Sequence, residues 1–281
     1  MNINDAVKML SECGIEEAEN EVRLLCEKFM SIPMSRSLIM RYDELDKMDG
    51  FGEFKEALEK RLTRYPMQYI LGEWEFYGMP MRVGEGCLIP RPDTELVAER
   101  AVIELKKQGK KEKYRCLDLC TGSGCIAIAV MYQVKQSEFT LVDISDSALK
   151  TARENLVLNG VTERARVLRG DAMTRLFEGE KFDLITANPP YIPEKVMAGL
   201  EPELSYEPRI ALTDGGDGLS FYRAIVEMYK NALTDNGSII FEHGYDQYEA
   251  VSEIAKSNGM SADVIMDYGK RKRGAVLKNL H

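Results

Sequence analysis

Apolar residues follow a strand-and-helix alternation over most of the chain. From about residue 115 onward, short apolar runs are separated by stretches with helical periodicity. Strands that alternate with helices favour a doubly wound α/β fold, in which a mostly parallel sheet carries helices on both faces. The runs predicted as strands are Cys116–Leu119, Glu138–Val142, Ala165–Leu168, Phe182–Ala187, Gly237–Glu242, Ala262–Met266 and Gly274–Leu277. The last two lie close enough in sequence to form an antiparallel pair at one edge.

The first 65 residues show helical spacing only. Apolar side chains recur at intervals of three and four along two segments, which end at Phe29 and at Tyr65. We therefore predict a small helical domain over residues 1–65. Its helices serve either to recognise a partner or only to pack on a neighbouring domain, and the sequence leaves both alternatives open.

Residues 66–92 contain an aromatic, β-prone stretch interrupted by Gly78-Met79-Pro80, which predicts a β-hairpin linker. The main domain then covers residues 93–281. Asp93 is the expected N-cap of a helix that runs to about Lys107.

Composition excludes several classes of protein. The 281 residues are 44% hydrophobic and 30% charged, as in ordinary globular domains, and no apolar run has the length of a membrane span. The start of the chain lacks the pattern of a signal peptide. The six cysteines form no CxxC pair, so we expect free thiols in a reducing cytoplasm.

Charge and histidine content narrow the chemistry further. Two histidines make a histidine-based triad or a metal site with several histidines improbable, and we expect no metal. The net charge of −9 argues against stable binding along a nucleic-acid backbone.

A ligand site is predicted where the first strand of the sheet ends. Gly122 and Gly124 lie between a strand and a helix, where glycines allow a ligand to approach backbone N–H groups. Asp143 ends the next strand, where a carboxylate can accept hydrogen bonds from ribose hydroxyls. The pattern indicates a nucleoside. Because Gly122-x-Gly124-x-x-Ala127 also matches the dinucleotide fingerprint, an oxidoreductase stays an alternative.

A second motif, Asn188-Pro189-Pro190-Tyr191, follows the strand Phe182–Ala187. The two prolines remove N–H donors and stiffen the backbone, so the loop presents carbonyl acceptors beside the Asn188 amide and the Tyr191 ring. Such a rim suits a planar NH2 group, although a rigid turn explains the same residues. Together with a nucleoside site, the motif favours methyl transfer from S-adenosylmethionine to nitrogen, with Asp171 near the adenine amino group.

These motifs resemble those of class I S-adenosylmethionine-dependent methyltransferases, which have a seven-stranded Rossmann-like sheet. Further segments are similar to those of the bacterial release factor N5-glutamine methyltransferase family, over nearly the whole chain. The segments are Tyr69–Glu73, Leu88–Glu95, Glu207–Arg209, Asp214–Leu219 and Glu242–Gly244.

The resemblance implies methylation of the glutamine side-chain amide in the Gly-Gly-Gln motif of peptide chain release factors. It implies that Cys120, Thr121, Gly122, Ser123 and Gly124 hold the methionine part of the cofactor and that Asp143 holds the ribose. Asp171 and Ala172 would border the adenine, and Asn188, Pro189, Pro190 and Tyr191 would hold the substrate and perform catalysis. Asn188 is also expected among the cofactor-binding residues. Many members have glycine in place of Cys120, and some have a bulkier residue in place of Ala172.

Acceptors aimed at both hydrogens of an amide nitrogen would also stabilise the positive charge that develops there, so no dedicated base is needed. We expect a cytoplasmic monomer with release factors as partners and no membrane. The alternatives are an N6-adenine methyltransferase for DNA or RNA and a non-catalytic nucleoside-binding module.

Overall fold

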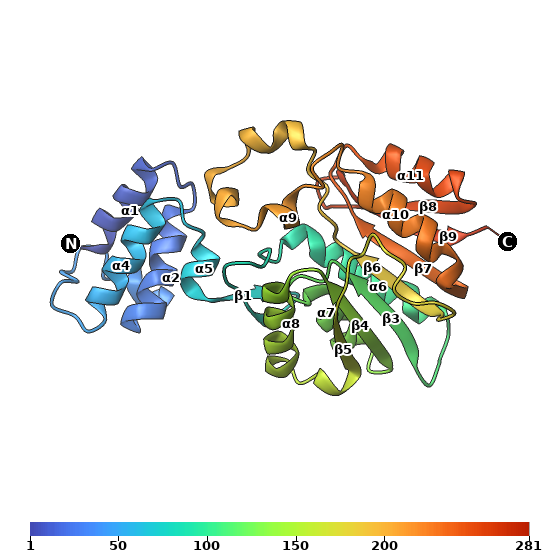
Figure 1. The fold of residues 1–281 in the computed structure, drawn as a ribbon. Coiled ribbons are helices and arrows are strands. Elements are labelled where there is room, and N and C mark those ends of the chain that lie inside the picture. The colour runs from blue at the N-terminus through green and yellow to red at the C-terminus, as the bar shows by residue number, and fades with distance from the viewer. Residues whose placement is uncertain (281) are drawn as a thin grey trace. The chain divides into compact units, whose positions relative to one another are not determined.

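The computed structural model describes residues 1–280, which form two compact units. The first unit comprises residues 1–73 together with residues 201–206, and the second comprises residues 74–200 together with the described residues from 207 onward. The elements of both units are labelled in Figure 1.

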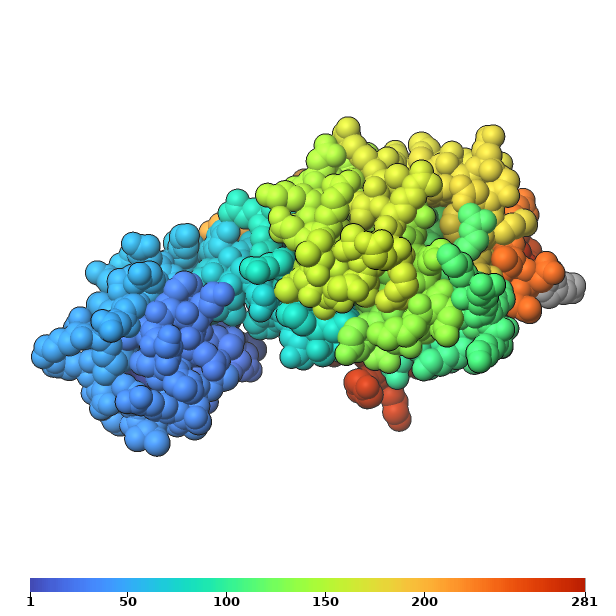
Figure 2. Space-filling model, turned by 90° about the horizontal axis from the view of Figure 1, so that it is seen from below, coloured from blue at the N-terminus to red at the C-terminus, as the bar shows by residue number. Residues whose placement is uncertain are grey.

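The first unit is built from helices around its own apolar core, as the helical spacing predicts. This core contains Val22, Leu25, Phe54 and Leu58, all almost completely buried. In Figure 2 the first 73 residues, drawn in blue, form one rounded body. The helices are α1 (Ile3–Glu12), α2 (Ala18–Met30), α3 (Met34–Ser37), α4 (Phe51–Leu62) and α5 (Met67–Leu71).

A short segment from much later in the chain completes this unit. The 3-10 helix η3 (Pro202–Tyr206) brings Glu203 to Arg61 and Arg64, with N–O distances of 3.0 and 2.8 Å. The Arg61 side chain is only 6% exposed and also pairs with Glu21 at 2.6 Å. A buried guanidinium needs carboxylate partners, and Glu203 of this segment supplies one of the two carboxylates that pair with Arg61. No sequence pattern predicts that residues 201–206 belong to the helical unit.

The second unit contains a seven-stranded sheet with the order β5-β4-β3-β6-β7-β9-β8. Strand β9 is antiparallel to both of its neighbours, and the other adjacent pairs are parallel. The predicted doubly wound sheet with an antiparallel edge pair is therefore confirmed. The strands are β3 (Tyr114–Leu119), β4 (Ser137–Asp143), β5 (Ala165–Arg169), β6 (Phe182–Ala187), β7 (Leu233–Glu242), β8 (Met260–Met266) and β9 (Lys272–Asn279).

Helices cover both faces of the sheet, each over its own apolar cluster (Figure 1). One face carries α6 (Pro92–Lys107), α7 (Cys125–Gln133) and α8 (Asp146–Leu158), and the other carries α10 (Ser220–Tyr229) and α11 (Tyr248–Ser257). The hairpin strands β1 (Glu73–Phe76) and β2 (Met79–Arg82) precede α6. The shorter helices are η1 (Thr162–Arg164), η2 (Glu194–Gly199), α9 (Arg209–Leu212) and η4 (Lys230–Ala232).

The expected N-cap of α6 is wrong. Arg91 occupies the cap position, Pro92 begins the helix, and Asp93 lies in the first turn. Proline is favoured at the start of a helix because its missing N–H would have had no helical partner there. The Asp93 carboxylate then interacts favourably with the positive end of the helix dipole instead of capping it.

The topological switch point of the sheet lies at β3, which pairs with β4 on one side and with β6 on the other. Leu119 is opposite Ala187, so the segments that begin at Cys120 and Asn188 leave the sheet side by side. Ligands of open α/β sheets bind outside the carboxyl ends of the strands at this point.

A later loop supports the segment that follows β6. Asp214 Oδ1 accepts hydrogen bonds from the N–H groups of Gly216 and Gly218, at 2.8 and 3.0 Å. Gly218 has φ +78°, and a Cβ atom there would lie 2.2 Å from the carbonyl oxygen of Tyr191. The same oxygen accepts a hydrogen bond from Gln247 Nε2 at 2.9 Å. The backbone at Tyr191 is therefore fixed from two sides.

We expect Gly218→Ala to destabilise the protein much more than Gly215→Ala. Both glycines have positive φ, but nothing lies within 4 Å of a Cβ atom at Gly215. Gly215→Ala should cost about 1–2 kcal/mol through backbone strain alone. Gly218→Ala adds the clash with Tyr191 and should cost at least about 4 kcal/mol. Urea unfolding of both variants tests this, and equal losses would contradict the close approach of the two loops.

Candidate active site

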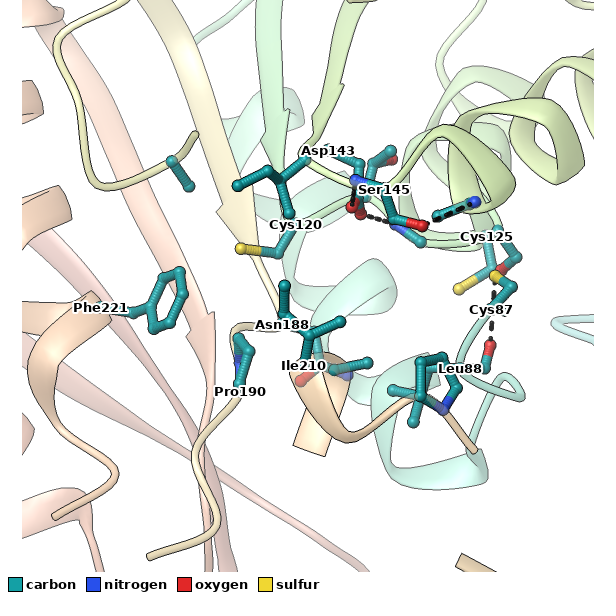
Figure 3. A pocket seen from close by; sticks show the side chains of 18 of the residues that line it. Cys87, Leu88, Cys120, Cys125, Asp143, Ser145, Asn188, Pro190, Ile210 and Phe221 are labelled. Carbon is teal, nitrogen blue, oxygen red and sulfur yellow. Dashed lines mark hydrogen bonds between the residues drawn. The ribbon is translucent and has the colours of Figure 1, made fainter. Parts of the chain in front are cut away.

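A cavity of about 310 Å³ lies at the carboxyl ends of β3, β4 and β6. This volume is in the range of small-molecule sites. Figure 3 shows side chains from the loops after these strands around one space, with Cys120 beside Asn188. Nine residues predicted for the site line this cavity, namely Cys120, Thr121, Gly122, Ser123, Asp143, Asp171, Ala172, Asn188 and Pro190.

Three other predicted residues do not line the cavity. Gly124 is the N-cap of α7 with φ +78°, and a Cβ atom there would approach Leu141 Cδ2 at 3.1 Å. Pro189 is buried. The Tyr191 hydroxyl donates a hydrogen bond to Glu242 Oε1 at 3.2 Å. These residues therefore shape the wall from behind.

The glycine loop after β3 is anchored by a buried carboxyl group. Asp118 is 1% exposed and accepts hydrogen bonds from the hydroxyls of Thr121 and Thr186, at 2.5 and 2.6 Å. Burial raises the pKa of Asp118 to about 6, against the opposing effect of these two hydroxyls. Asp118 thus connects the loop to the strands beneath it.

Asp143 connects the same loop to β4. Its Oδ2 accepts a hydrogen bond from Gly122 N at 2.8 Å, and its Oδ1 accepts one from Ser145 N at 2.9 Å. Burial raises the pKa of Asp143, while these N–H donors lower it. A carboxylate has about four acceptor positions, so two remain for a ligand.

Cys120 adopts an unusual backbone conformation for a residue with a side chain. Its φ of +54° lies in the left-handed region, where glycine alone carries little strain. The side chain packs against the apolar cluster on the α10 face. A loop that is strained at the ligand is held in place by the bonds of Asp118 and Asp143 around it.

The opposite wall consists of Leu88, Ile89, Pro90 and Arg91. Glu207, which is 5% exposed, accepts a hydrogen bond from Ile89 N at 3.0 Å and forms an ion pair with Arg91. This places the motifs Leu88–Glu95 and Glu207–Arg209 at one site. The spacing and chemistry of the residues did not predict this wall, although both motifs are among the segments that resemble the methyltransferase family.

The charged side chains of the lining favour a cationic ligand. Asp143, Asp171 and Asp214 contribute carboxylates, and the single cation is Arg91, which Glu207 neutralises. A pyrophosphate would bring further negative charge to this lining, whereas a sulfonium or ammonium group would be attracted. Within residues 1–280 no cluster of three or more His, Cys, Asp or Glu side chains has the geometry of a metal site.

The Asn188 amide has a defined partner inside the protein. Its Nδ2 donates a long hydrogen bond, 3.4 Å, to Thr94 Oγ1, and Thr94 is 2% exposed. Among residues 1–280 no donor is bonded to Asn188 Oδ1, and Asn188 lines the cavity, so this oxygen is available there as an acceptor. Thr94 and Glu242, which surround this amide, had no place in the predicted site.

Known proteins match both units. The Methyltransferase small domain family matches residues 101–222, and the PrmC N-terminal domain family matches residues 3–72. A release factor glutamine methyltransferase of Fusobacterium nucleatum subsp. nucleatum is 42% identical over 278 residues, which are 98% of this chain and 77% of the relative. That of Thermodesulfovibrio yellowstonii is 37% identical over 276 residues, which are 93% and 98% of the two chains.

Solved structures agree on the fold alone. The hMettl16 catalytic domain, solved in complex with MAT2A 3'UTR hairpin 6, has a TM-score of 0.58 and 15% identity over 80% of this chain and 82% of its own. A ribosomal protein L11 methylase from Lactobacillus delbrueckii subsp. bulgaricus has a TM-score of 0.50 and 22% identity over 72% and 86%. With two sequence relatives matched over most of both chains, the protein belongs to the release factor glutamine methyltransferase family.

Proposed function

We propose that this protein methylates the side-chain amide nitrogen of the glutamine in the Gly-Gly-Gln motif of peptide chain release factors, with S-adenosylmethionine as the methyl donor. One observation carries the proposal. The same cavity is lined by the glycine loop with the Asp143 carboxylate and by Asn188, whose Oδ1 is available as an acceptor. The relatives described above are named release factor glutamine methyltransferases, which supports the same activity for this protein.

The residues present fit this cofactor. Asp143 keeps two acceptor positions for ribose hydroxyls, and the surplus of carboxylates suits the positive charge of a sulfonium. Cys120 to Ser123 would border the methionine part, and Asp171 and Ala172 would border the adenine. When bound, S-adenosylmethionine supplies an electrophilic methyl group on sulfur.

The role of Asn188 follows from the weak nucleophilicity of an amide. The lone pair of an amide nitrogen is delocalised into its carbonyl group. Asn188 Oδ1 and the carbonyl group of Pro190, which both belong to residues lining the cavity, would accept hydrogen bonds from the substrate NH2. These acceptors would hold the nitrogen in position and stabilise the positive charge that develops on it. The sulfur would leave as a neutral thioether, and the methylated nitrogen would lose one proton to water, so no dedicated base is needed.

The decisive test is transfer of labelled methyl from S-adenosylmethionine to three substrates offered separately: a release factor, duplex DNA and RNA. We expect label in the release factor only, and none when alanine replaces the glutamine of its Gly-Gly-Gln motif. Label in DNA or RNA would instead support an N6-adenine methyltransferase. Cofactor binding without any transfer would leave a nucleoside-binding module.

We expect Asn188→Ala to slow single-turnover transfer about a hundredfold, because a preorganised polar contact in the transition state is worth on the order of 3 kcal/mol. Cofactor affinity, measured by calorimetry, should change much less because Asp143 and Gly122 remain. Asn236→Ala, at an exposed asparagine of β7, is the control and should behave as wild type. An Asn188→Ala rate equal to wild type would rule out the amide-holding role.

We further propose that the helical unit, residues 1–73, docks the release factor. Leu38, Ile39 and Tyr42 lie within five residues of each other in sequence and are 49%, 85% and 76% exposed. Exposed apolar side chains gathered in this way are typical of protein-binding surfaces.

The double substitution Ile39→Ser with Tyr42→Ser should raise KM for intact release factor roughly tenfold, since exposed aromatic anchors often dominate an interface. The turnover at saturation and cofactor affinity should not change. Tyr268→Ser, at a 97% exposed tyrosine of the second unit, is the matched control. An unchanged KM in the double variant would exclude this surface from docking.

A further inference from the structure

Glu242 is a buried acid next to the proposed substrate site. It is the last residue of β7, and because Ala187 is opposite Phe241, Asn188 and Glu242 follow as neighbours. The residue is 2% exposed and does not line the cavity. Its Oε1 accepts the hydroxyl of Tyr191, while its Oε2 is buried without a hydrogen-bond partner among residues 1–280. Burying a carboxyl oxygen without a hydrogen-bond partner costs free energy, so the position of this acid calls for an explanation.

Thr94 lies between this acid and Asn188. The Thr94 hydroxyl accepts a hydrogen bond from Asn188 Nδ2, so its own hydrogen is available to another acceptor. Both Thr94 and Asn188 act on the carboxyl group of Glu242 and favour its ionised form. The open Oε2 of Glu242 is therefore the acceptor toward which the Thr94 hydroxyl can turn.

This arrangement decides which end of the Asn188 amide faces the substrate. With Nδ2 donating to Thr94, Oδ1 is the amide atom left to accept a hydrogen bond from the substrate. Turned by 180°, the amide would present its own NH2 to the NH2 of the substrate, and both would be donors. Fixing the amide orientation is thus a requirement for the proposed reaction.

We infer that Glu242 and Thr94 are positioning residues that hold the Asn188 amide with its oxygen toward the substrate nitrogen. The inference rests on the proposed function. Glu242 and Thr94, which were not predicted as site residues, thereby have a role in orienting Asn188.

The protonation state of Glu242 makes this role pH-dependent. Burial raises its pKa to about 7, and Thr94, Tyr191 and Asn188 oppose the rise. The ionised carboxylate accepts hydrogen bonds from its neighbours, whereas the protonated form must donate one. Other ionisable groups that interact with Glu242 are Asp93, Tyr222 and Cys125, while Arg273 acts on its partner Tyr191.

Ionisation of Glu242 changes the methyl-transfer rate and the stability of the protein in opposite directions. The folded-state pKa is raised, so the contribution of protonated Glu242 to stability is complete below its ordinary pKa and is lost as pH rises through about 7. The methyl-transfer rate should instead increase through the same range, as the orienting carboxylate forms. The site therefore gives up stability for orientation.

Three variants test the inference in single-turnover methyl transfer. Glu242→Gln and Thr94→Val should each slow transfer roughly tenfold to a hundredfold, by analogy with the loss of hydrogen-bond partners that orient metal ligands. Cofactor affinity should stay within about twofold of wild type. Thr94→Ser keeps the hydroxyl and should restore the rate. In wild type the rate should rise with pH around 7, and in Glu242→Gln this rise should be absent.

A second readout does not depend on activity. In protein labelled with ¹⁵N at asparagine, the Asn188 side-chain signal, identified by its loss in Asn188→Ala, should titrate near pH 7 in wild type. It should not titrate in Glu242→Gln. A signal that does not titrate, or variants that transfer methyl at the wild-type rate and with its pH profile, would overturn the inference. Wild-type protein that transfers no methyl to a release factor would contradict the proposed function instead, and the titration would still decide whether Glu242 acts on Asn188.

Discussion

The parallel pairing of β3 with β6 is the constraint on which the site depends. Leu119 and Ala187 are opposite each other, so the two loops that follow emerge from the sheet at the same level. One loop turns back over Asp118 and Asp143, and the other continues into a segment without N–H donors at its prolines. A shift of β6 by one residue against β3 would turn Asn188 to the other side of the sheet relative to Asp118. The loops that begin at Cys120 and Asn188 are thus aligned by backbone hydrogen bonds rather than by side-chain packing.

Three buried carboxyl groups at this edge of the sheet each hold a loop in place through hydrogen bonds. Asp118 fixes the glycine loop, Glu207 fixes the wall at Ile89, and Glu242 lies behind Asn188. Each carboxyl group accepts hydrogen bonds from donors on a segment distant in sequence. Loops that carry function are usually the mobile parts of a protein, and such acceptors make them rigid without an apolar core of their own.

Much of this could be predicted from the sequence because local patterns determine it. Apolar runs located the strands, and the glycines, Asp143 and Asn188 lay at strand ends, where the topology alone brings them together. The partners of Asn188 could not be found in this way. Thr94 lies on a helix and Glu242 on another strand, and neither residue type is unusual at its position. Their approach depends on tertiary packing, as does the pairing of Glu207 with Arg91. The N-cap at Asp93 failed because Pro92 begins the helix one residue earlier.

The segment 201–206 has a consequence for how the chain acquires its structure. Glu203 belongs to the helical unit, yet it is 142 positions away in sequence from its partner Arg61. During synthesis the helices emerge first, and their apolar core consists of early residues only. The ion-pair network around Arg61 nevertheless stays incomplete until most of the sheet strands have been made. The two units therefore cannot mature as fully independent domains in order of synthesis, since a contact of such long range has to wait for the later part of the chain.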